Sequence, residues 1–507
     1  MSSPMPSSST LIQPGSQPEY GSRPKTEARA MMGGLGDGEN SSLLEEQPAQ
    51  RRSKRGRERQ LELLDRALEE TFGSGKYQRR LLAVSAFSIF VDASEGALSP
   101  MLYVEFQREW GVALNELAVI GASSSAGLMM GSLLVGLLAD RFGRATGFVW
   151  SLVAVALFGY ISSMAVNVAT FAASRFFVGV AAGGNFVTSS ALLFEAVPKP
   201  VRGRYVMMTG IAFGVTHLLT VGIAWAFFPT IGWRWAIRIL ALLALPVLYI
   251  FRDVRETPRF HVVSSRFEEA VDTVRHIASE NGVPNPLFLS AKELRQCQSD
   301  QQQHSGAALG RQSTYNAMLE AFSSKKLRVL APLVAVWFLV AFSNGIVQFL
   351  PLEIEKFTGK FNVQFIVGIV LSLSALLATA INVTVVDRVG RRVVICVGCC
   401  VASVSTYSLR LDDNTATFLT SVFLLHCAIC VVTATLYLFT PESFPTQIRG
   451  TMFGICVVVS RVASITAPIL FGTLDHESLA DKSAIFGSFA LLAAVMSCAL
   501  VNTKRYS

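Results

Sequence analysis

Charge is scarce in this sequence, and cysteine is absent from its first 296 residues. Aspartate, glutamate, lysine and arginine make up only 16% of the 507 residues, whereas a soluble globular chain carries about 25%. Apolar residues make up 51%, and the mean hydropathy is +0.44. This balance excludes an ordinary soluble domain and is typical of a chain that lies mostly within a membrane.

The cysteines that are present give little support for a metal site. All eight follow residue 296, and seven lie in long apolar runs. Cys427-x-x-Cys430 and the group Cys396, Cys399 and Cys400 resemble metal-ligand spacing, but no carboxylate lies near either group. Cysteine is also a common small buried residue, so we expect free thiols, no metal and no cofactor.

Twelve long apolar runs account for the composition, and each approaches the roughly 20 residues that a helix needs to cross hydrocarbon. The runs lie near 81–104, 115–138, 145–164, 168–194, 205–228, 233–251, 327–352, 363–386, 392–409, 415–438, 450–472 and 483–501. They predict an all-α integral membrane protein with twelve transmembrane helices in a lipid bilayer.

Two charged motifs recur at one offset. Asp140-Arg141-Phe142-Gly143-Arg144 returns 247 positions later as Asp387-Arg388-Val389-Gly390-Arg391. Glu195-x-x-Pro198-x-x-x-Arg202 returns at the same offset as Glu442-x-x-Pro445-x-x-x-Arg449. A single register for two separate motifs indicates an internal duplication. It predicts two pseudo-symmetric six-helix bundles with a transport pathway between them.

Lysine and arginine are concentrated on one side of the predicted topology. The N-terminal tail and the connections after even-numbered helices carry most of them. The positive-inside rule therefore places both termini in the cytoplasm, for a protein of a plasma membrane or an intracellular vesicle membrane. Because the cations are spread over membrane loops, the net charge of +8 does not indicate a nucleic-acid partner.

These features divide the chain into five parts. We predict a disordered cytoplasmic tail at 1–76 with an amphipathic helix at 57–72, a six-helix bundle at 77–252, a cytoplasmic linker at 253–326, a second six-helix bundle at 327–502 and a cytoplasmic tail at 503–507. The linker is too short and too poor in apolar residues to form an enzymatic domain.

Acidic residues inside the first apolar run are the strongest functional signal. Asp92 and Glu95 are three positions apart, which puts both carboxylates near one face of a helix. An ionisable side chain at this depth is costly unless it faces a cavity or a partner. The pair predicts a site for proton coupling or cation binding. A salt bridge between helices is the alternative, and Arg175 in the fourth run is the obvious partner.

Three other polar residues interrupt apolar runs. Arg461 in the eleventh run has no charged neighbour there, so it predicts contact with an anionic substrate group or an ion pair across a cavity. Asn344 and Gln348, beside Gly345, indicate a break in the seventh helix of the kind that lines transporter binding sites. Polar packing is the alternative for both.

The duplicated motifs predict a different role, because they lie at the cytoplasmic ends of helices. Acidic and basic residues on one membrane face can form a network that closes that face in one conformation and breaks in the other. The predicted gate comprises Asp140, Arg141, Arg144, Glu195, Arg202, Asp387, Arg388, Arg391, Glu442 and Arg449. The alternative is that the arginines only set the topology.

At this point the residues resemble a known family. Gly136-x-x-x-Asp140-Arg141-x-Gly143-Arg144 resembles the signature loop of the major facilitator superfamily, and the copy at Asp387 resembles its second occurrence. Glu256-Thr257-Pro258-Arg259-Phe260 is similar to a family signature after the sixth helix. Ala145 and Val383 depart from the pattern, where a basic residue and a glycine are usual. The resemblance implies two six-helix bundles that rock around a central site.

Within that superfamily the chain resembles the branch of synaptic-vesicle-related proteins and organic-ion transporters. Gly73-x-Gly75-Lys76-Tyr77-Gln78, Trp233-Arg234-Trp235 and Arg461 carry this resemblance. The expectation is a secondary active transporter of a small organic solute, an organic anion coupled to protons, and not an enzyme. A sugar porter is the first alternative, although the expected pair of glutamines is missing from the seventh helix. A receptor or scaffold that has lost transport is the second.

Overall fold

The computed structural model describes residues 64, 75–283, 290–302, 324–359, 362–409, 414–444 and 449–500. The chain divides into two units, 1–51 and 52–507, and all described residues belong to the second. The predicted amphipathic helix at 57–72 therefore lies outside the described residues, except for the buried Leu64. The division into domains inferred from the sequence stays a prediction.

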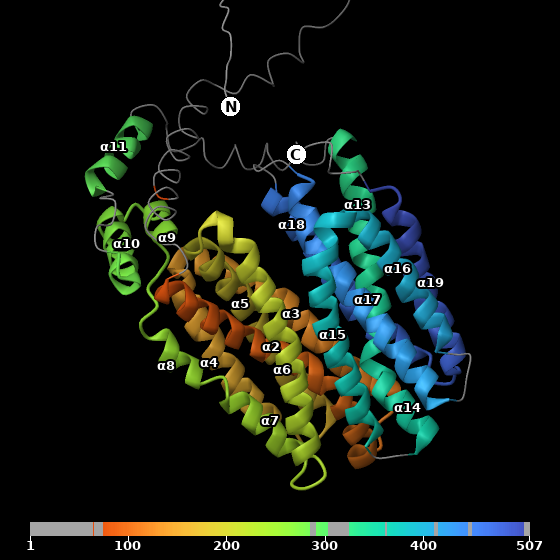
Figure 1. The fold of residues 1–507 in the computed structure, drawn as a ribbon. Helices are drawn as coiled ribbons and strands as arrows, with labels where there is room; N and C mark the ends of the chain where they lie inside the picture. The colour runs from red at the N-terminus through yellow and green to blue at the C-terminus, as the bar shows by residue number, and fades with distance from the viewer. Residues whose placement is uncertain are drawn as a thin grey trace, which may run out of the picture. The chain divides into compact units, whose positions relative to one another are not determined.

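The described residues fold into helices, and Figure 1 shows two groups of long helices side by side. The first group consists of α2 (Lys76–Trp110), α3 (Leu114–Phe142), α4 (Arg144–Ser162), α5 (Val168–Ala196), α6 (Lys199–Phe227), α7 (Trp233–Leu242) and α8 (Pro246–Phe251). Short helices follow at α9 (Pro258–Val263), α10 (Phe267–Asn281) and α11 (Ala291–Gln302). The second group consists of α13 (Ser324–Ser343), the 3₁₀ helix η1 (Asn344–Phe349), α14 (Leu350–Thr358), α15 (Val363–Val389), α16 (Arg391–Ser408), α17 (Thr415–Glu442), α18 (Arg449–Thr473) and α19 (Leu479–Ser497).

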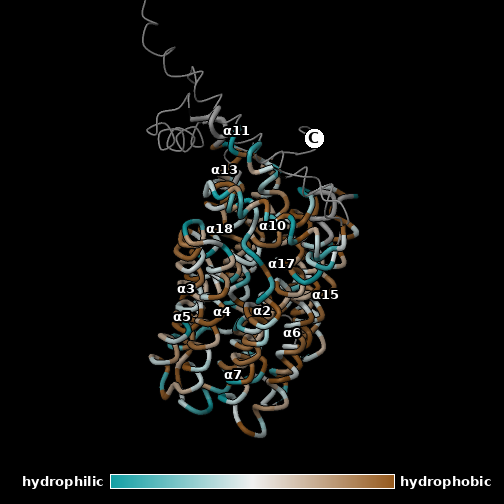
Figure 2. The backbone as a smooth tube through the Cα atoms, turned by 90° about the vertical axis from the view of Figure 1, so that its left-hand side faces the viewer, coloured by the Kyte–Doolittle hydropathy of each residue, from teal (hydrophilic) through white to brown (hydrophobic). Residues whose placement is uncertain are grey.

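Eleven helical segments of the described residues are long and apolar enough to cross a membrane. Two of them combine several elements, because α7 with α8 forms the span Trp233–Phe251 and α13, η1 and α14 form Leu327–Lys356. The 18-residue α16, which begins with Arg391 and Arg392, lies where the sequence predicts the ninth span and packs against α17 and α19. Figure 2 shows apolar residues along the bundle and hydrophilic residues on α10 and α11. The predicted all-α membrane fold is confirmed.

Two turns repeat with the duplication. The chain passes from α3 to α4 at Gly143 and from α15 to α16 at Gly390, with φ of 107° and 100°. Glycine alone adopts such angles without strain, which explains why both copies of the charged motif contain it. We call the end of the molecule that carries these two turns the motif end, and the other end the opposite end.

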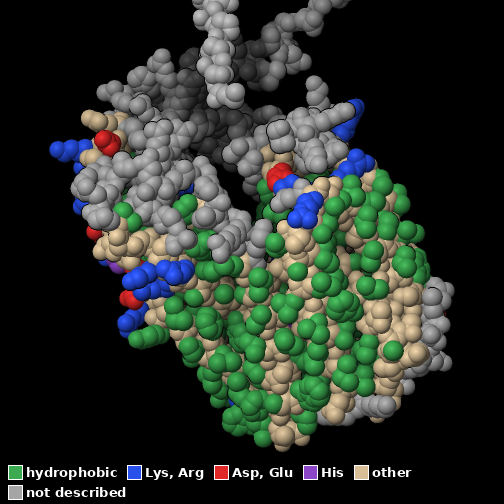
Figure 3. Space-filling model, viewed as in Figure 1, with side chains coloured by type: hydrophobic (Ala, Val, Ile, Leu, Met, Phe, Trp, Pro, Cys, Tyr) green, Lys and Arg blue, Asp and Glu red, His purple; other side chains and the backbone are tan. Residues whose placement is uncertain are grey.

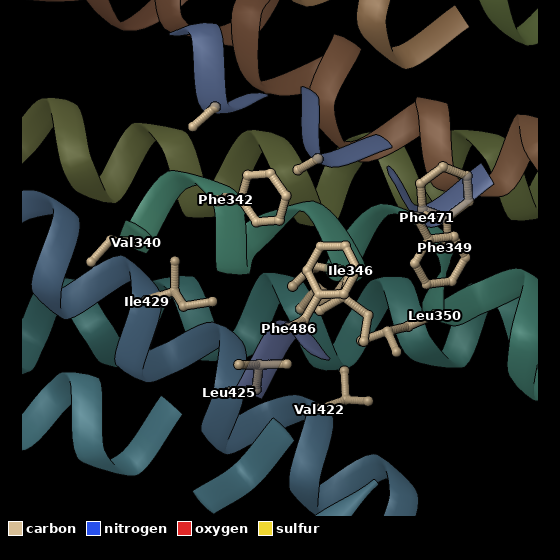
Figure 4. Close-up of a cluster of buried hydrophobic side chains, with 14 of the residues drawn as sticks. Val340, Phe342, Ile346, Phe349, Leu350, Val422, Leu425, Ile429, Phe471 and Phe486 are labelled. Atoms are coloured by element: carbon tan, nitrogen blue, oxygen red, sulfur yellow. The ribbon is translucent and has the colours of Figure 1, made fainter. Parts of the chain in front are cut away.

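Hydrophobic packing joins the two halves from the opposite end to the middle of the molecule, where a Cβ atom on Gly214 of α6 would lie 2.6 Å from Leu376 of α15. One large core cluster contains residues of both halves, including Tyr103, Phe106, Phe349, Phe471 and Phe486. Figure 4 shows Phe349 and Phe471 against each other within it, with ring centroids 4.3 Å apart. Two further clusters each lie within one half and do not cross between the halves. Figure 3 shows the surface hollowed between the halves at that end, so the halves separate towards the motif end.

Reciprocal glycines bring α3 and α5 into backbone contact. A Cβ atom on Gly131 would lie 1.9 Å from the carbonyl oxygen of Val180, and one on Gly183 would lie 2.3 Å from that of Leu128. Such contact is possible only without side chains, and it is how small residues stabilise helix pairs in membranes. This crossing fixes the position of Arg175, which lies on α5 one turn before Gly179.

Replacing Gly131 with alanine is expected to lower the free energy of unfolding by about 1–3 kcal/mol, because the methyl group forces α3 and α5 apart. The matched control is Gly222→Ala in α6, where no heavy atom lies within 4 Å of the added Cβ. Thermal unfolding of both variants in detergent checks this. Equal midpoints for the two variants would show that the crossing tolerates a methyl group.

Candidate functional site

An acid and an arginine meet inside the first half of the molecule. Glu95 Oε2 of α2 lies 2.5 Å from Nη2 of Arg175 of α5, whose side chain is 1% exposed. None of the three guanidinium nitrogens has an acceptor in hydrogen-bonding geometry, so the contact is electrostatic rather than an aligned hydrogen bond. The guanidinium also lies 5.2 Å from the centre of the Phe171 ring. Arg175 therefore has donor capacity left for another ligand.

Polar atoms from the two halves converge around Gly121 of α3. A Cβ atom on Gly121 would lie 2.8 Å from the hydroxyl of Tyr103 and 3.0 Å from Oε1 of Gln348. The hydroxyl of Tyr103 is buried without a hydrogen-bond partner, and so is Oδ1 of Asn344. Buried polar atoms are rarely left unpaired, so the Tyr103 hydroxyl, which lies beside Gln348 of the other half, fits a polar ligand between the halves.

The remaining predicted substrate residues have fewer contacts that the structure describes. Arg461 is half-buried in α18, and no acid whose side chain the structure describes lies within ion-pair distance of it. Asp92 occupies α2 one turn before Glu95, but its side chain is not among those described. The predicted break in the seventh span is present, because η1 interrupts the α-helix at Asn344 and Gln348.

At the motif end of the first half, charges form a connected group. Nη1 of Arg144 donates to Oε2 of Glu195 at 2.8 Å, and its Nη2 lies 3.5 Å from Oδ1 of Asp140. The hydroxyl of Thr257 donates to the same oxygen of Glu195 at 2.6 Å. Glu256 accepts from the backbone nitrogen of Ala145 at 2.9 Å. The segment after the sixth span therefore clamps the turn between α3 and α4.

The second half repeats the central ion pair of this group. Nε of Arg391 lies 2.7 Å from Oε2 of Glu442, and these residues are 247 positions after Arg144 and Glu195. Arg141 and Arg388 are exposed, whereas the side chains of Arg202, Asp387 and Arg449 lie outside the described part of the chain. Both described ion pairs join residues of the same half. In this conformation Arg144 with Glu195 and Arg391 with Glu442 are thus paired within their own halves.

The residues of the Glu256–Phe260 segment and Tyr103 were not predicted as site residues. The segment was noted only as a family signature, although its threonine-proline start is a typical helix beginning. Thr257 caps α9 by accepting from the backbone nitrogen of Phe260 at 3.2 Å. Tyr103 has no comparable signal in the sequence, because an aromatic residue in an apolar run is expected to lie in the hydrophobic core.

Comparison with known proteins decides the family. The model of the Major Facilitator Superfamily matches residues 84–468, well over half of the chain. The chain belongs to the major facilitator superfamily. The predicted membership is thereby confirmed, and this major facilitator superfamily protein is a multi-pass membrane transporter that takes a small-molecule substrate, not an enzyme.

Relatives within the major facilitator superfamily extend over most of the chain. The niacin transporter NiaP of Acinetobacter baylyi is 27% identical over 438 residues, which are 85% of this chain and 95% of the relative. The synaptic vesicle 2-related protein of Xenopus laevis is 24% identical over 458 residues, 86% of this chain and 80% of the relative. The predicted synaptic-vesicle-related branch is therefore confirmed.

A solved structure shows the same fold. The xylose transporter XylE from E. coli, in a partially occluded inward open conformation, superimposes with a TM-score of 0.63. The match covers 83% of this chain and 98% of that chain at 18% identity, so the likeness extends to the major facilitator fold alone.

Proposed function

We propose that this protein moves a small organic anion across a membrane by alternating access and couples that movement to protons. The observation that carries the proposal is the buried Arg175, which has Glu95 as a close partner and hydrogen-bond donors that are unused. The relative named as a niacin transporter makes a small aromatic carboxylate the first substrate to test.

Proton coupling follows from the sum of charges at this pair. In the empty site Glu95 and Arg175 neutralise each other. A substrate carboxylate that binds the unused donors of Arg175 adds one negative charge to this neutral pair, and a proton on Glu95 cancels that charge. Asp92 and Arg461 add one negative and one positive charge, so they do not alter this sum. Anion and proton together keep the site neutral.

Partly loaded sites carry a net charge, and this enforces the coupling. A proton alone leaves one positive charge and an anion alone leaves one negative charge. One net charge of either sign costs on the order of 2.5–3.5 kcal/mol at the centre of a membrane. Only the empty protein and the fully loaded protein therefore change conformation readily. The proposed transport is therefore electroneutral, with one proton for each singly charged anion. The rest of the solute is attracted and contacted by Asn344, Gln348 and Arg461.

The motif end is the cytoplasmic side in this proposal, as the distribution of lysine and arginine predicts. With the halves apart at that end, the conformation is inward-facing, and the paired gate residues Arg144 with Glu195 and Arg391 with Glu442 remain within their halves. Closing the motif end would bring the two groups together across the interface, together with Asp140, Arg202, Asp387 and Arg449.

Uptake into proteoliposomes tests the function. A panel of labelled nicotinate, other organic anions, organic cations and sugars is compared with and without an inward proton gradient, while potassium and valinomycin set the membrane potential. Uptake of an anion that is driven by the proton gradient and does not change with the membrane potential supports the proposal. Uptake of a sugar instead favours the sugar-porter alternative, and uptake that follows the potential contradicts electroneutral coupling.

A further inference from the structure

An ion pair links the two halves at the opposite end. Arg108, near the end of α2, donates through Nη2 to Oε1 of Glu355 in α14. The two side chains are 33% and 17% exposed, so the pair is partly shielded from water. Neither residue belongs to the gate motifs or to the central site. Their contact is the only ion pair between the two halves among the side chains that the structure describes.

The position of this pair is fixed by the duplication. Arg108 and Glu355 are 247 positions apart, the same offset that relates the two copies of the gate motifs. They are therefore equivalent positions of the two halves. The midpoint of two points related by a two-fold rotation lies on the rotation axis, so residues at equivalent positions that touch each other must lie beside that axis. The ion pair thus lies at the pseudo-two-fold axis of the molecule.

A second bond between the halves reinforces the contact. Nε2 of Gln364 in α15 donates to Oε1 of Glu105 in α2 at 3.0 Å. Nη1 of Arg108 also donates to Oε1 of Glu105, at 3.3 Å. Glu105 therefore connects the ion pair to a third helix. We call Glu105, Arg108, Glu355 and Gln364 the axis latch.

The first half holds its side of the latch firmly. Glu109, next to Arg108, accepts from Nε1 of Trp233 at 2.6 Å and from Nη1 of Arg234 at 3.0 Å, which ties the end of α2 to α7. The end of α2 therefore moves with the first half.

The second half holds its side through a buried pair. Glu353, two residues before Glu355, accepts from Nζ of Lys482 of α19 at 3.0 Å, and the two side chains are 9% and 2% exposed. Since α14 is bound to α19 in this way, it cannot swing away by itself. The ends of α2 and α14 can thus move apart only when the two halves separate.

We propose that the axis latch holds the opposite end shut in this conformation and must break each time the protein opens towards that side. The proposal rests on the alternating access of the proposed function. Opposite charges are essential, because two like charges at the axis would repel each other at the point where the halves meet. The latch therefore sets the balance between the two conformations without contact with the substrate.

Charge reversal with a restoring swap tests the latch. Spin labels are placed on cysteines at Ile231 and Ala416, which are exposed at the opposite end of the first and second half, in the full chain with its native cysteines replaced. Electron-spin resonance then measures the distance between them without substrate. Arg108→Glu and Glu355→Arg are each expected to raise the population with the longer distance at least ~5-fold. The swap Arg108→Glu with Glu355→Arg is expected to restore the short distance.

The swap separates the latch from a folding defect. A single variant that merely misfolds is not rescued by a second reversal, whereas a broken latch is. Unchanged distances in both single variants would overturn the proposal, and so would a swap that behaves like the single variants. The readout is a distance and not uptake. The latch can therefore be confirmed or overturned whether or not the protein transports an anion with protons. Gln364→Leu is expected to shift the distance in the same direction by a smaller factor.

Discussion

Replacing Glu95 with glutamine is expected to reduce proton-driven accumulation of the substrate about 100-fold while exchange of substrate across the membrane continues. In this variant the empty site holds Arg175 without its acidic partner, and the cost of that charge, on the order of 2.5–3.5 kcal/mol, slows the return of the empty protein. The anion-loaded site is neutral and still changes conformation. Net uptake under a pH gradient and counterflow at equal pH, measured in the same proteoliposomes, separate the two effects.

The control for this experiment lies on the next helix, α3. Glu116→Gln replaces an exposed acid in the first turn of α3, and its amide oxygen can still accept from the backbone of Ala113, so both kinds of flux should match the unaltered protein. Asp92→Asn tests whether the second carboxylate of α2 shares the proton. Equal losses of net uptake and of counterflow in Glu95→Gln would show that Glu95 has a structural role rather than a coupling role. Unimpaired net uptake would remove it from the mechanism.

The duplication made part of the site predictable. Because Arg144 and Arg391 occupy equivalent positions, as Glu195 and Glu442 do, one register predicted that both pairs would lie at one end of the molecule, and each pair is in contact. The expected partnership of α2 with Arg175 was also correct for Glu95. These successes share one cause. A charge in an apolar helix has few ways to be satisfied, so its presence restricts where it can lie.

The axis latch was not predicted, because the duplication relates its two charged residues but does not show that they touch. Neither Arg108 nor Glu355 was predicted as a site residue. The offset of 247 relates them, but a repeat shows only that two positions are equivalent. Whether equivalent positions touch depends on how far each lies from the axis, which the arrangement of α2 and α14 decides. The unpaired hydroxyl of Tyr103 was hidden for a similar reason, since one sequence does not say which face of α2 meets the other half.

The buried pair of Lys482 and Glu353 is expected to give the largest loss of stability from a single substitution. Lys482 lies in the first turn of α19, where a lysine usually reaches water, yet its side chain is 2% exposed. Its Nζ lies 3.0 Å from Oε1 of Glu353 and 4.9 Å from the centre of the Phe471 ring. Lys482→Met leaves the Glu353 carboxylate buried without this partner, which is expected to cost about 3–5 kcal/mol.

A second substitution distinguishes a stranded charge from lost packing. Lys482→Met with Glu353→Leu removes both charges and keeps the volume, so it is expected to recover most of the stability, since buried ion pairs are often replaceable by apolar residues. Lys356→Met is the matched control, because Lys356 lies 3.8 Å from the same oxygen but is 38% exposed, and its loss should cost less than about 1 kcal/mol. Thermal unfolding followed by tryptophan fluorescence measures all three. A double variant no more stable than Lys482→Met would show that this site needs its ion pair to hold α14 against α19, and the spin-label distance in that variant should then lengthen as it does when the axis latch is broken.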